Sequence, residues 1–409
     1  MSTDVLPDPT VPPTSLVTGF DALTPEVMRA RGSLKWTRYP GDVIGAWVAE
    51  MDLGTAPSVR EAIVRAATQG TLGYMPPALP RELAQVLAGY ERDAFGWDVD
   101  PDEVSLLPDV LSSLRAIIAH HTREGSAVIV PTPAYMPFLS IPGRLGRECV
   151  QVPALVGEDP DGRPRWELDL DRVETAMADG AGLLVLCNPW NPVGRVLVPE
   201  ELDAVAALSG RYGVPVFSDE IHAPLVLDPD MVHVPYASRP GADPALTFTA
   251  TAASKGWNVP GLKCAQLVAS GAARQAWDAC DASHHLAFEA SILGARATVA
   301  AFRDGRGWLE EVCAYVRGNA GLVADALAEV PGARLTVPEG TYLAWLDCSG
   351  LGLERSPADF LRQEAHVAFN DGAAFGTGYE QFVRVNLATG HGIETETARR
   401  VVAALTGRL

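Results

Sequence analysis

The amino-acid sequence predicts an α/β protein with a mainly parallel sheet and a second, smaller α+β unit. Four continuous runs of apolar or β-branched residues are typical of strands that are covered on both faces. They lie at 126–131, 181–189, 215–219 and 245–254. Helical patterns lie before and between them, at 57–70, 79–96, 110–124 and 199–213. Strands that alternate with helices favour a parallel sheet joined by right-handed crossovers.

The remaining elements divide the chain into three predicted parts. Residues 1–15 are rich in proline and small polar residues, and we expect a flexible arm there. From about residue 291 a long helical region, strand-like segments and a terminal helix follow, which is typical of an α+β unit. The predicted domains are therefore a large domain over 58–290 and a small domain made of 16–57 and 291–409.

The composition favours a protein that acts on small molecules. The formal charge of −19 argues against binding to nucleic acid or to an anionic membrane surface, because both attract basic proteins. No apolar run approaches the roughly 20 residues that span a bilayer, and the N-terminus lacks the basic and apolar regions of a secretion signal. The 6 cysteines have no paired spacing, which suits reduced thiols in the cytoplasm and argues against a metal site.

Lysine is scarce, since the sequence contains only Lys35, Lys255 and Lys263. An amine nucleophile is a task that arginine cannot perform, because its guanidinium group stays protonated in proteins. Lys255 follows a strand-like run and stands between Ser254 and Gly256, where partial burial would lower its pKa as a Schiff-base amine requires. The alternative is a solvated lysine on a loop. Lys263 either binds a phosphate or is an ordinary surface lysine.

Polar side chains also occur at two other strand ends and within a later strand. Ligands of open α/β sheets bind at the carboxyl ends of the strands. Asn191, in the motif NPWNPVGR, is placed to donate to a cofactor oxygen, unless the motif is only a turn. Asp219, in VFSDEIHAP, faces a cation such as a protonated pyridine nitrogen, or else it caps a helix. Arg384, in the alternating segment 382–390, holds a carboxylate or snorkels from an edge strand, and we favour the carboxylate.

Four motifs in this order, Asn-Pro-x-Asn-Pro-x-Gly, Asp-Glu-Ile-His, Ser-Lys and Arg-x-Asn, resemble those of fold-type I enzymes that use pyridoxal 5′-phosphate (PLP). Within the class I/II aminotransferase superfamily, the chain is most similar to the cystathionine β-lyase-like C–S lyase branch. Further matching segments occur at 33–57, 70–74 and 131–138. The resemblance implies an aspartate-aminotransferase-like fold, with a three-layer αβα large domain, a mostly parallel seven-stranded sheet and a smaller α+β domain.

The resemblance also implies a role for each matching position. Lys255 would hold PLP as a Schiff base and exchange protons at the substrate Cα. Asp219 would pair with the ring nitrogen and keep it protonated, Asn191 would bond the ring hydroxyl, and Tyr135 would stack on the ring. Arg384 would bind the substrate carboxylate, with Asn191 beside it.

The phosphate of the cofactor would lie at a helix N-terminus. Its implied partners are the backbone amides of Val110 and Leu111, the side chains of Ser254 and Lys263, and Tyr74 of a neighbouring subunit. The contact from Tyr74 implies a homodimer with shared active sites.

Three positions depart from the family pattern. Asp109 stands where the family usually has glycine, Ala252 where many relatives have serine, and Trp257 where phenylalanine is common. An acidic Asp109 beside a phosphate is awkward unless its side chain turns away and caps the helix.

His222, three residues after Asp219, indicates the branch of the family. Aminotransferases often carry tyrosine at this place, whereas the Asp-Glu-Ile-His form resembles the C–S lyases. His222 either contacts the cofactor directly or only hydrogen-bonds Asp219 and orients it. The leading hypothesis is β-elimination from a cysteine S-conjugate or cystathionine-like amino acid, which yields a thiol, pyruvate and ammonia.

Three alternative functions stay open. Transamination between an amino acid and a 2-oxo acid would use the same residues, and so would decarboxylating or oxidative chemistry on a specialised amino acid. A PLP-binding regulator without turnover is least favoured. Regulators on this fold carry a helix-turn-helix domain ahead of it, and fewer than about 60 residues precede the predicted large domain.

Overall fold

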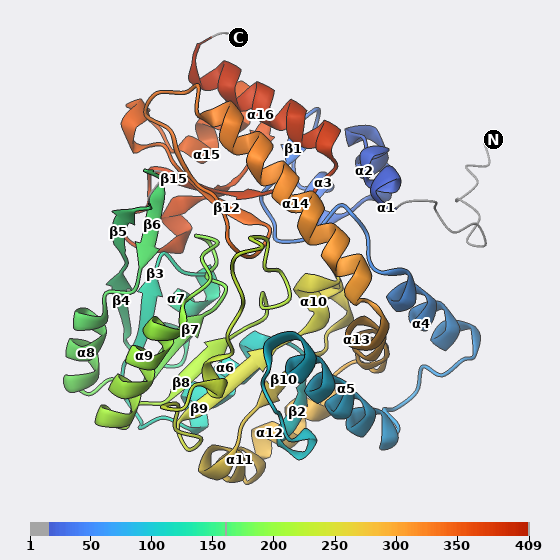
Figure 1. The fold of residues 1–409 in the computed structure, drawn as a ribbon, viewed down its shortest axis with the longest axis vertical. Coiled ribbons are helices and arrows are strands. Elements are labelled where there is room, and N and C mark those ends of the chain that lie inside the picture. Colours follow the sequence, from blue (N-terminus) through green and yellow to red (C-terminus); the bar gives the residue numbers. More distant parts are fainter. Residues whose placement is uncertain (1–15, 160–161, 408–409) are drawn as a thin grey trace.

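A seven-stranded sheet forms the centre of the protein (Figure 1), in a computed structural model that describes residues 16–159 and 162–407. In spatial order its strands are β2 (Val104–Leu107), β10 (Ala265–Val268), β9 (Thr247–Thr251), β8 (Val216–Asp219), β7 (Leu183–Cys187), β3 (Val128–Thr132) and β4 (Cys149–Pro153). β10 runs antiparallel to β2 and β9, and the other strands share one direction. The predicted seven-stranded, mostly parallel sheet is confirmed.

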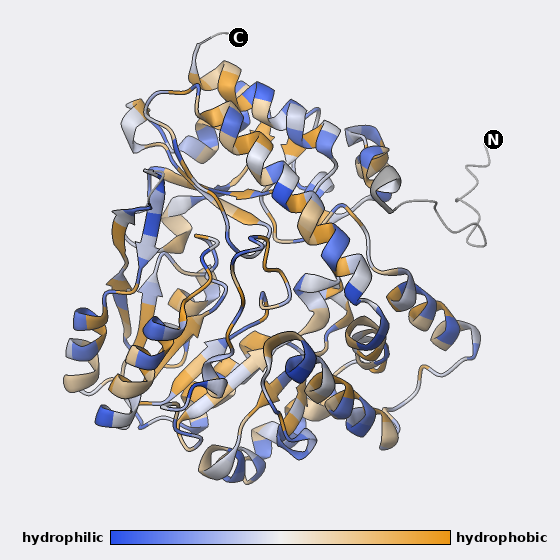
Figure 2. Cartoon of the chain, viewed as in Figure 1, coloured by the Kyte–Doolittle hydropathy of each residue, from blue (hydrophilic) through white to orange (hydrophobic). Residues whose placement is uncertain are grey.

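Alternate residues of the central strands pack into two apolar cores, one on each face of the sheet. In β7, Leu184 and Leu186 belong to one core, and Leu183 and Val185 belong to the other. The first core is covered by α8 (Leu170–Ala178) and α9 (Pro199–Tyr212), and the second by α6 (Val110–His120), α7 (Met136–Arg144) and α11 (Gly271–Asp278). Figure 2 shows the apolar residues concentrated on these central strands. Burial on both faces explains their unbroken apolar runs and gives the three-layer arrangement.

The other helices extend the core at both ends of the sheet. They are α1 (Leu16–Asp21), α2 (Pro25–Arg31), α3 (Leu34–Thr37), α4 (Pro57–Thr68), α5 (Ala78–Phe95), α10 (Ala253–Gly256), α12 (Asp281–Glu289), α13 (Ile292–Asp304), α14 (Arg306–Leu327), α15 (Pro357–Phe360) and α16 (His391–Leu405). α5 ends where the sequence predicts, because Gly96 adopts the left-handed conformation (φ 69°) that closes helices. α4 and α5 pack on α13, and the rings of Tyr90 and Phe302 stack at 4.8 Å.

The long helical region expected from about residue 291 is divided into α13 and α14 at Gly305. The indole N–H of Trp257 donates to the carbonyl of Gly305 at 3.0 Å. A Cβ at residue 305 would lie 2.4 Å from the indole nitrogen and 2.6 Å from the carbonyl oxygen of Ala301. The close approach of Trp257 therefore requires glycine at the break.

A smaller antiparallel sheet lies above the central sheet in Figure 1. Its strands, in spatial order, are β11 (Arg334–Thr336), β12 (Leu343–Asp347), β15 (Phe382–Asn386) and β14 (Asn370–Asp371). A separate parallel pair joins β1 (Ile44–Gly45) to β13 (Val367–Ala368), and a hairpin joins β5 (Leu155–Glu158) to β6 (Pro164–Glu167). The β1–β13 pair places the N-terminal segment against the C-terminal unit, beside the carboxyl ends of the central strands.

The domain boundaries at residues 58 and 290 stay a prediction, and the predicted arm at 1–15 lies outside the described residues. All seven strands of the central sheet fall within 104–268, and all four strands of the smaller sheet fall within 334–386. Among the helices in the described part of the chain, none has the length and apolar character needed to cross a bilayer.

Gly305→Ala is expected to lower the free energy of unfolding by about 1–3 kcal/mol, because the added methyl group forces Trp257 away from the chain break. The loss is measured by urea denaturation. Gly307→Ala is the matched control, since a Cβ at residue 307 meets nothing within 4 Å and the position is helical. Equal stability losses in both variants would contradict the packing explanation.

Candidate active site

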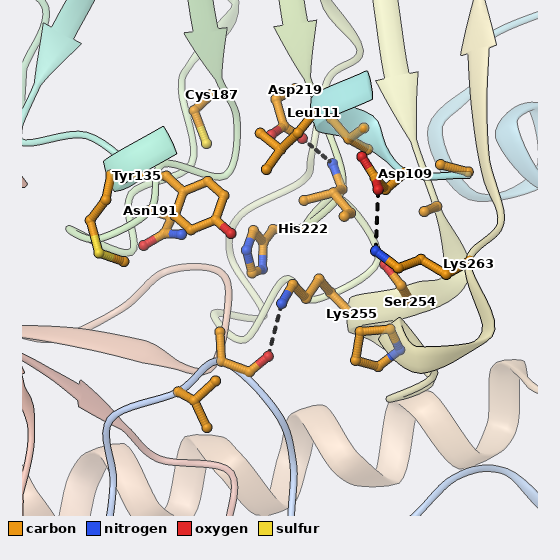
Figure 3. A pocket seen from close by; sticks show the side chains of 18 of the residues that line it. Asp109, Leu111, Tyr135, Cys187, Asn191, Asp219, His222, Ser254, Lys255 and Lys263 are labelled. Atoms are coloured by element: carbon orange, nitrogen blue, oxygen red, sulfur yellow. Dashed lines mark hydrogen bonds and ion pairs between the residues drawn. The ribbon is translucent and has the colours of Figure 1, made fainter. Parts of the chain in front are cut away.

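A cavity of about 380 Å³ lies between the carboxyl ends of the central strands and the smaller sheet. Figure 3 shows the side chains that converge on it. Of the eleven site residues predicted from the sequence, ten line this cavity: Val110, Leu111, Tyr135, Asn191, Asp219, His222, Ser254, Lys255, Lys263 and Arg384. The eleventh, Tyr74, does not line it and is treated below.

Lys255 lies in the short helix α10, directly after β9, and its side chain enters the cavity (Figure 3). Its Nζ donates a hydrogen bond of 2.8 Å to the carbonyl of Ala49, more than 200 residues away in the chain. Burial, followed by the charge of Arg384, lowers the pKa of Lys255 to about 8, although the carboxylate of Asp219 acts in the opposite direction. The amine is therefore a half-buried nucleophile that loses its proton readily, and not a solvated loop lysine.

Asp219 ends β8 on the floor of the cavity and is only 4% exposed. Burial raises its pKa to about 7, against the lowering effects of the backbone N–H of Ile221 and of the charge of Lys255. The residues that follow form a turn, so Asp219 does not cap a helix as one interpretation of the sequence expected. A buried carboxylate with so few donors is costly unless a cation approaches it. A protonated ring nitrogen would supply that cation.

His222 occupies the middle of the cavity, with its ring edge-on to Tyr342 at 6.1 Å. Burial, with the charges of Lys255 and Arg384, holds the pKa of His222 well below its usual value, so the ring is neutral. Its Nδ1 has no hydrogen-bond partner among the described residues. The hydrogen bond between His222 and Asp219 that the sequence suggested is not formed; Asp219 accepts from Ile221 N at 3.1 Å.

Arg384 projects into the cavity from β15, which lies between β12 and β14. It is 2% exposed and donates to Asn191 Oδ1 at 3.1 Å and to the carbonyl of Trp47 at 3.0 Å. The interpretation of an arginine that snorkels from an edge strand is therefore wrong. Burial lowers the pKa of Arg384 to about 10, and its Nε has no partner within the described residues. A buried guanidinium of this kind favours an anion, and its planar shape suits a carboxylate.

The opposite end of the cavity is the N-terminus of α6. Asp109 caps this helix, because its Oδ1 accepts from Ser112 N at 2.9 Å and from Ser112 Oγ at 2.8 Å. Its Oδ2 pairs with Lys263 Nζ at 3.2 Å. Burial acts to raise the pKa of Asp109, but the hydrogen bonds from Ser112 and Lys263 hold it below its usual value. Asp109 therefore caps α6, which is the role that makes an acidic residue acceptable at this position. Because the cap uses the amide of Ser112, the amides of Val110 and Leu111 remain at the open end of the helix.

Tyr74 lies outside the cavity and is 87% exposed. Its ring lies 6.0 Å from that of Phe288, which is 74% exposed. The structure therefore gives Tyr74 no contact with the site of its own chain. Its predicted contact was with the site of a neighbouring subunit, and it stays a prediction.

Several residues of the site carry no role in the sequence interpretation. Trp47, Cys187 and Asn370 line the cavity, while Tyr342 and Asn386 lie directly behind it. Trp47 lies in the family-like segment 33–57 and Asn386 in the Arg-x-Asn motif, but the resemblance implies no function for either side chain. The signal that could have found Asn386 is its position two residues after Arg384 in an alternating strand, which places both side chains on one face.

Known proteins resemble this chain over most of its length. The family model described as aminotransferase class I and II matches residues 42–405. The chain belongs to the aminotransferase class I and II family. The cystathionine beta-lyase of Corynebacterium glutamicum is 38% identical over 381 residues, which cover 93% of this chain and 98% of the relative.

More distant relatives have similar names. The cystathionine beta-lyase PatB of Bacillus subtilis is 29% identical over 383 residues, which cover 91% of this chain and 97% of the relative. Among solved structures, the PLP-bound C-S lyase of Staphylococcus hominis superposes with a TM-score of 0.85 at 25% identity, covering 95% of this chain and 99% of that one. The expected family and the aminotransferase-like fold are confirmed.

Lys255 is expected to react with small aldehydes only as the neutral amine, so its rate should rise with pH through about 8 and then level off. Arg384→Met removes a positive charge and should move this midpoint upward by about one unit, and Asp219→Asn should move it downward. Reductive labelling of the cofactor-free protein, read by mass spectrometry at Lys255, gives the profile. Lys263 in the same digest is the internal control. Midpoints that ignore both substitutions would show that these charges do not act on the amine.

Proposed function

We propose that the protein is a PLP-dependent C–S β-lyase that cleaves a cysteine S-conjugate or cystathionine-like amino acid to a thiol, pyruvate and ammonia. The observation that carries this proposal is the convergence of a low-pKa amine, a buried carboxylate and a buried arginine in one cavity. Each of these groups matches one part of PLP or of an amino-acid substrate. The lyase names of the relatives support the branch.

The residues of the cavity fit PLP. Asp219 offers a carboxylate for the ring nitrogen, and Tyr135 and His222 line the space around the ring. The phosphate would be bound by the amides of Val110 and Leu111 with the help of Ser254 and Lys263. When bound, PLP supplies an electron sink for the negative charge that develops at the substrate Cα.

The side chains of this chain then have separate tasks. Arg384 binds the substrate carboxylate, and Asn191, which already accepts from Arg384, fixes that carboxylate in place. Lys255 would hold the cofactor, and its amine would accept the proton from the substrate Cα and deliver a proton to the departing thiolate. A pKa near 8 suits both proton transfers at neutral pH. The apolar walls around Trp47 and Met136 exclude water from these steps.

Transamination stays the second candidate, because it uses the same amine, carboxylate and arginine. The relatives named above favour elimination, since all three are named as lyases. No observation favours decarboxylating or oxidative chemistry, or a regulator without turnover. Cytoplasmic localisation is part of the proposal, because all six cysteines are free in the structure, as expected in a reducing compartment.

The proposal includes a homodimer with shared active sites. Tyr74 and Phe288 form an exposed aromatic pair, and Val64 and Leu72 are more than half exposed nearby in the chain. Exposed apolar groups of this kind are typical of surfaces that are covered by a partner. A second copy of the chain would bring Tyr74 to the phosphate end of the neighbouring site.

Incubation of the PLP-loaded enzyme with L-cystathionine and several S-alkyl-L-cysteines is expected to release thiol and pyruvate in equal amounts. Amino donors without a β-leaving group should give little 2-oxo acid and little pyridoxamine phosphate. Thiol, oxo acid and pyridoxamine phosphate are measured separately. Lys255→Ala is the control and should lower kcat by at least ~10²-fold, because it lacks the acid–base group. Accumulation of pyridoxamine phosphate without thiol would instead establish an aminotransferase.

A mixture of Lys255→Ala and Tyr74→Ala proteins is expected to regain lyase activity after subunit exchange. In the mixed dimer, one site combines Lys255 from one chain with Tyr74 from the other, and so carries neither substitution. The matched control mixes Lys255→Ala with Asp219→Asn, where both altered groups belong to the same chain's site and every site keeps one defect. Activity is measured as pyruvate release. Regain in the control, or none in the first mixture, argues against a shared site.

A further inference from the structure

The segment that follows β1 lines the cavity, and the side chain of Asn386 holds it in place. The side-chain amide of Asn386 donates to the carbonyl of Val48 at 2.6 Å and to that of Glu50 at 2.8 Å. Its Oδ1 accepts from Ala388 N at 2.8 Å, and the side chain is 0% exposed. The amide nitrogen therefore holds the backbone on either side of Ala49, while the bond from Ala388 to the amide oxygen orients the side chain.

Ala49 lies at the apex of a tight turn, because Glu50 N also donates to the carbonyl of Val48 at 2.9 Å. With the carbonyls of residues 48 and 50 both directed to Asn386, the carbonyl of Ala49 is the one that faces the cavity. It accepts from Lys255 Nζ at 2.8 Å and from the hydroxyl of Tyr342 at 2.9 Å (Figure 3 shows the bond from Lys255).

Tyr342 is a permanent donor to this carbonyl. It is 1% exposed, and burial raises the pKa of its hydroxyl far above neutral pH, so the proton stays on the oxygen. The ring is also fixed, since it packs edge-on against His222. The carbonyl of Ala49 is therefore shared between a fixed hydroxyl and the one amine that moves during turnover.

We propose that Asn386 aims the carbonyl of Ala49 at the Lys255 amine, and that Tyr342 shares this carbonyl so that the amine is directed but not trapped. Asn386 and Tyr342 are thus positioning residues for the steps in which Lys255 is free of the cofactor. This inference rests on the proposed role of Lys255. It gives a function to Asn386 and to Tyr342, for which the family motifs imply none.

The chemistry of the amine explains why a fixed acceptor is useful. A neutral amine that donates one N–H to Ala49 has its lone pair turned to the other side, where it takes the proton from the substrate Cα. The resulting ammonium keeps its bond to Ala49 and passes one proton to the departing thiolate sulfur, which restores the neutral amine. Because the amine is held in one orientation, it does not have to reorient before either proton transfer.

An uncharged acceptor also suits the electrostatics around Lys255. The charged and titratable groups near the amine are Arg384 from β15, Asp219 from β8, Glu50 from the clamped segment, His222 in the cavity and Tyr342 directly behind it. Arg384 opposes protonation of the amine, while a carbonyl stabilises the ammonium more than the neutral amine. The carbonyl of Ala49 therefore offsets part of the effect of Arg384 without adding a charge beside the substrate.

The test uses the full-length protein loaded with pyridoxamine 5′-phosphate, which fills the cofactor site but leaves the Lys255 amine free. Since the chain contains three lysines, labelling lysine with ¹³C at Cε gives three NMR signals, and Lys255→Arg assigns the one that matters. Asn386→Ala is expected to lower the pKa of Lys255 by about one unit, because the ammonium loses a well-directed acceptor. Tyr342→Phe is expected to raise it, because the carbonyl is no longer shared.

Asn258→Ala is the matched control. Asn258 clamps the same segment a few residues later, accepting from Met51 N at 2.9 Å and donating to the carbonyls of Met51 at 2.9 Å and Gly54 at 3.1 Å. Its loss should destabilise the protein much as Asn386→Ala does, but leave the pKa of Lys255 in place. If Asn386→Ala leaves this pKa unchanged, or if both asparagine variants move it equally, the proposal is overturned. Tyr342→Phe removes a single hydroxyl, and an unchanged or lowered pKa in that variant overturns the sharing of the carbonyl even if Asn386→Ala does not fold.

Kinetics of the PLP-loaded enzyme give a second readout. With Cα-deuterated S-alkyl-cysteine, Asn386→Ala should lower kcat and increase the isotope effect on kcat, while KM and the visible absorption of bound PLP stay close to those of the unaltered protein. A fall in kcat with no rise in the isotope effect contradicts a role in proton transfer. Absence of thiol release from the unaltered enzyme would overturn the proposed lyase function, whereas the NMR shifts would still report on the positioning of Lys255.

Discussion

The low pKa of the Lys255 amine depends on burial and on neighbouring buried charges that the protein alone does not balance. Lys255 and Arg384 place two buried cationic groups in the same cavity as the buried carboxylate of Asp219, and burial shifts the pKa of each toward its neutral form. Ionised groups in such a place are costly unless they have partners. In the proposed complex, PLP would supply a ring cation for Asp219, and an amino-acid substrate would supply a carboxylate for Arg384. The site is therefore complementary to its ligands through charges that the protein cannot satisfy alone.

The fold creates this arrangement by joining segments that are remote in sequence. The central sheet contributes Asp219 and Lys255 at neighbouring strand ends, and the smaller sheet contributes Arg384 from an interior strand. Between them runs the segment after β1, whose far end is held by the buried pair of Lys35 and Asp52 at 2.9 Å. Because this segment is fixed by Asn386 from the smaller sheet and by Asn258 from the chain after α10, a backbone carbonyl at its centre can serve as a precise acceptor.

The sequence predicted those parts of the site whose signal is local. Asp219 and Lys255 each follow an apolar run, so periodicity alone places them at strand ends, and the helix cap by Asp109 follows from its position before α6. The acceptor on Ala49 has no such signal, because it is a main-chain oxygen on a residue without functional side-chain atoms. The same applies to the break at Gly305, which depends on an indole ring from a segment 48 residues earlier in the chain. Contacts between distant segments had to come from the structure.

The acidic phosphate turn shows how a departure from the family pattern can be tolerated. Asp109 uses one oxygen for two bonds to Ser112, which tie it to α6, and only the other oxygen meets Lys263. The ion pair is solvated, with the Lys263 side chain 59% exposed, and pairs of this kind contribute little to stability. Lys263 can therefore turn to a phosphate while Asp109 keeps the helix capped. In the proposed complex the carboxylate would repel the phosphate, so retention of the cofactor would depend more on the helix amides and on the proposed covalent bond to Lys255.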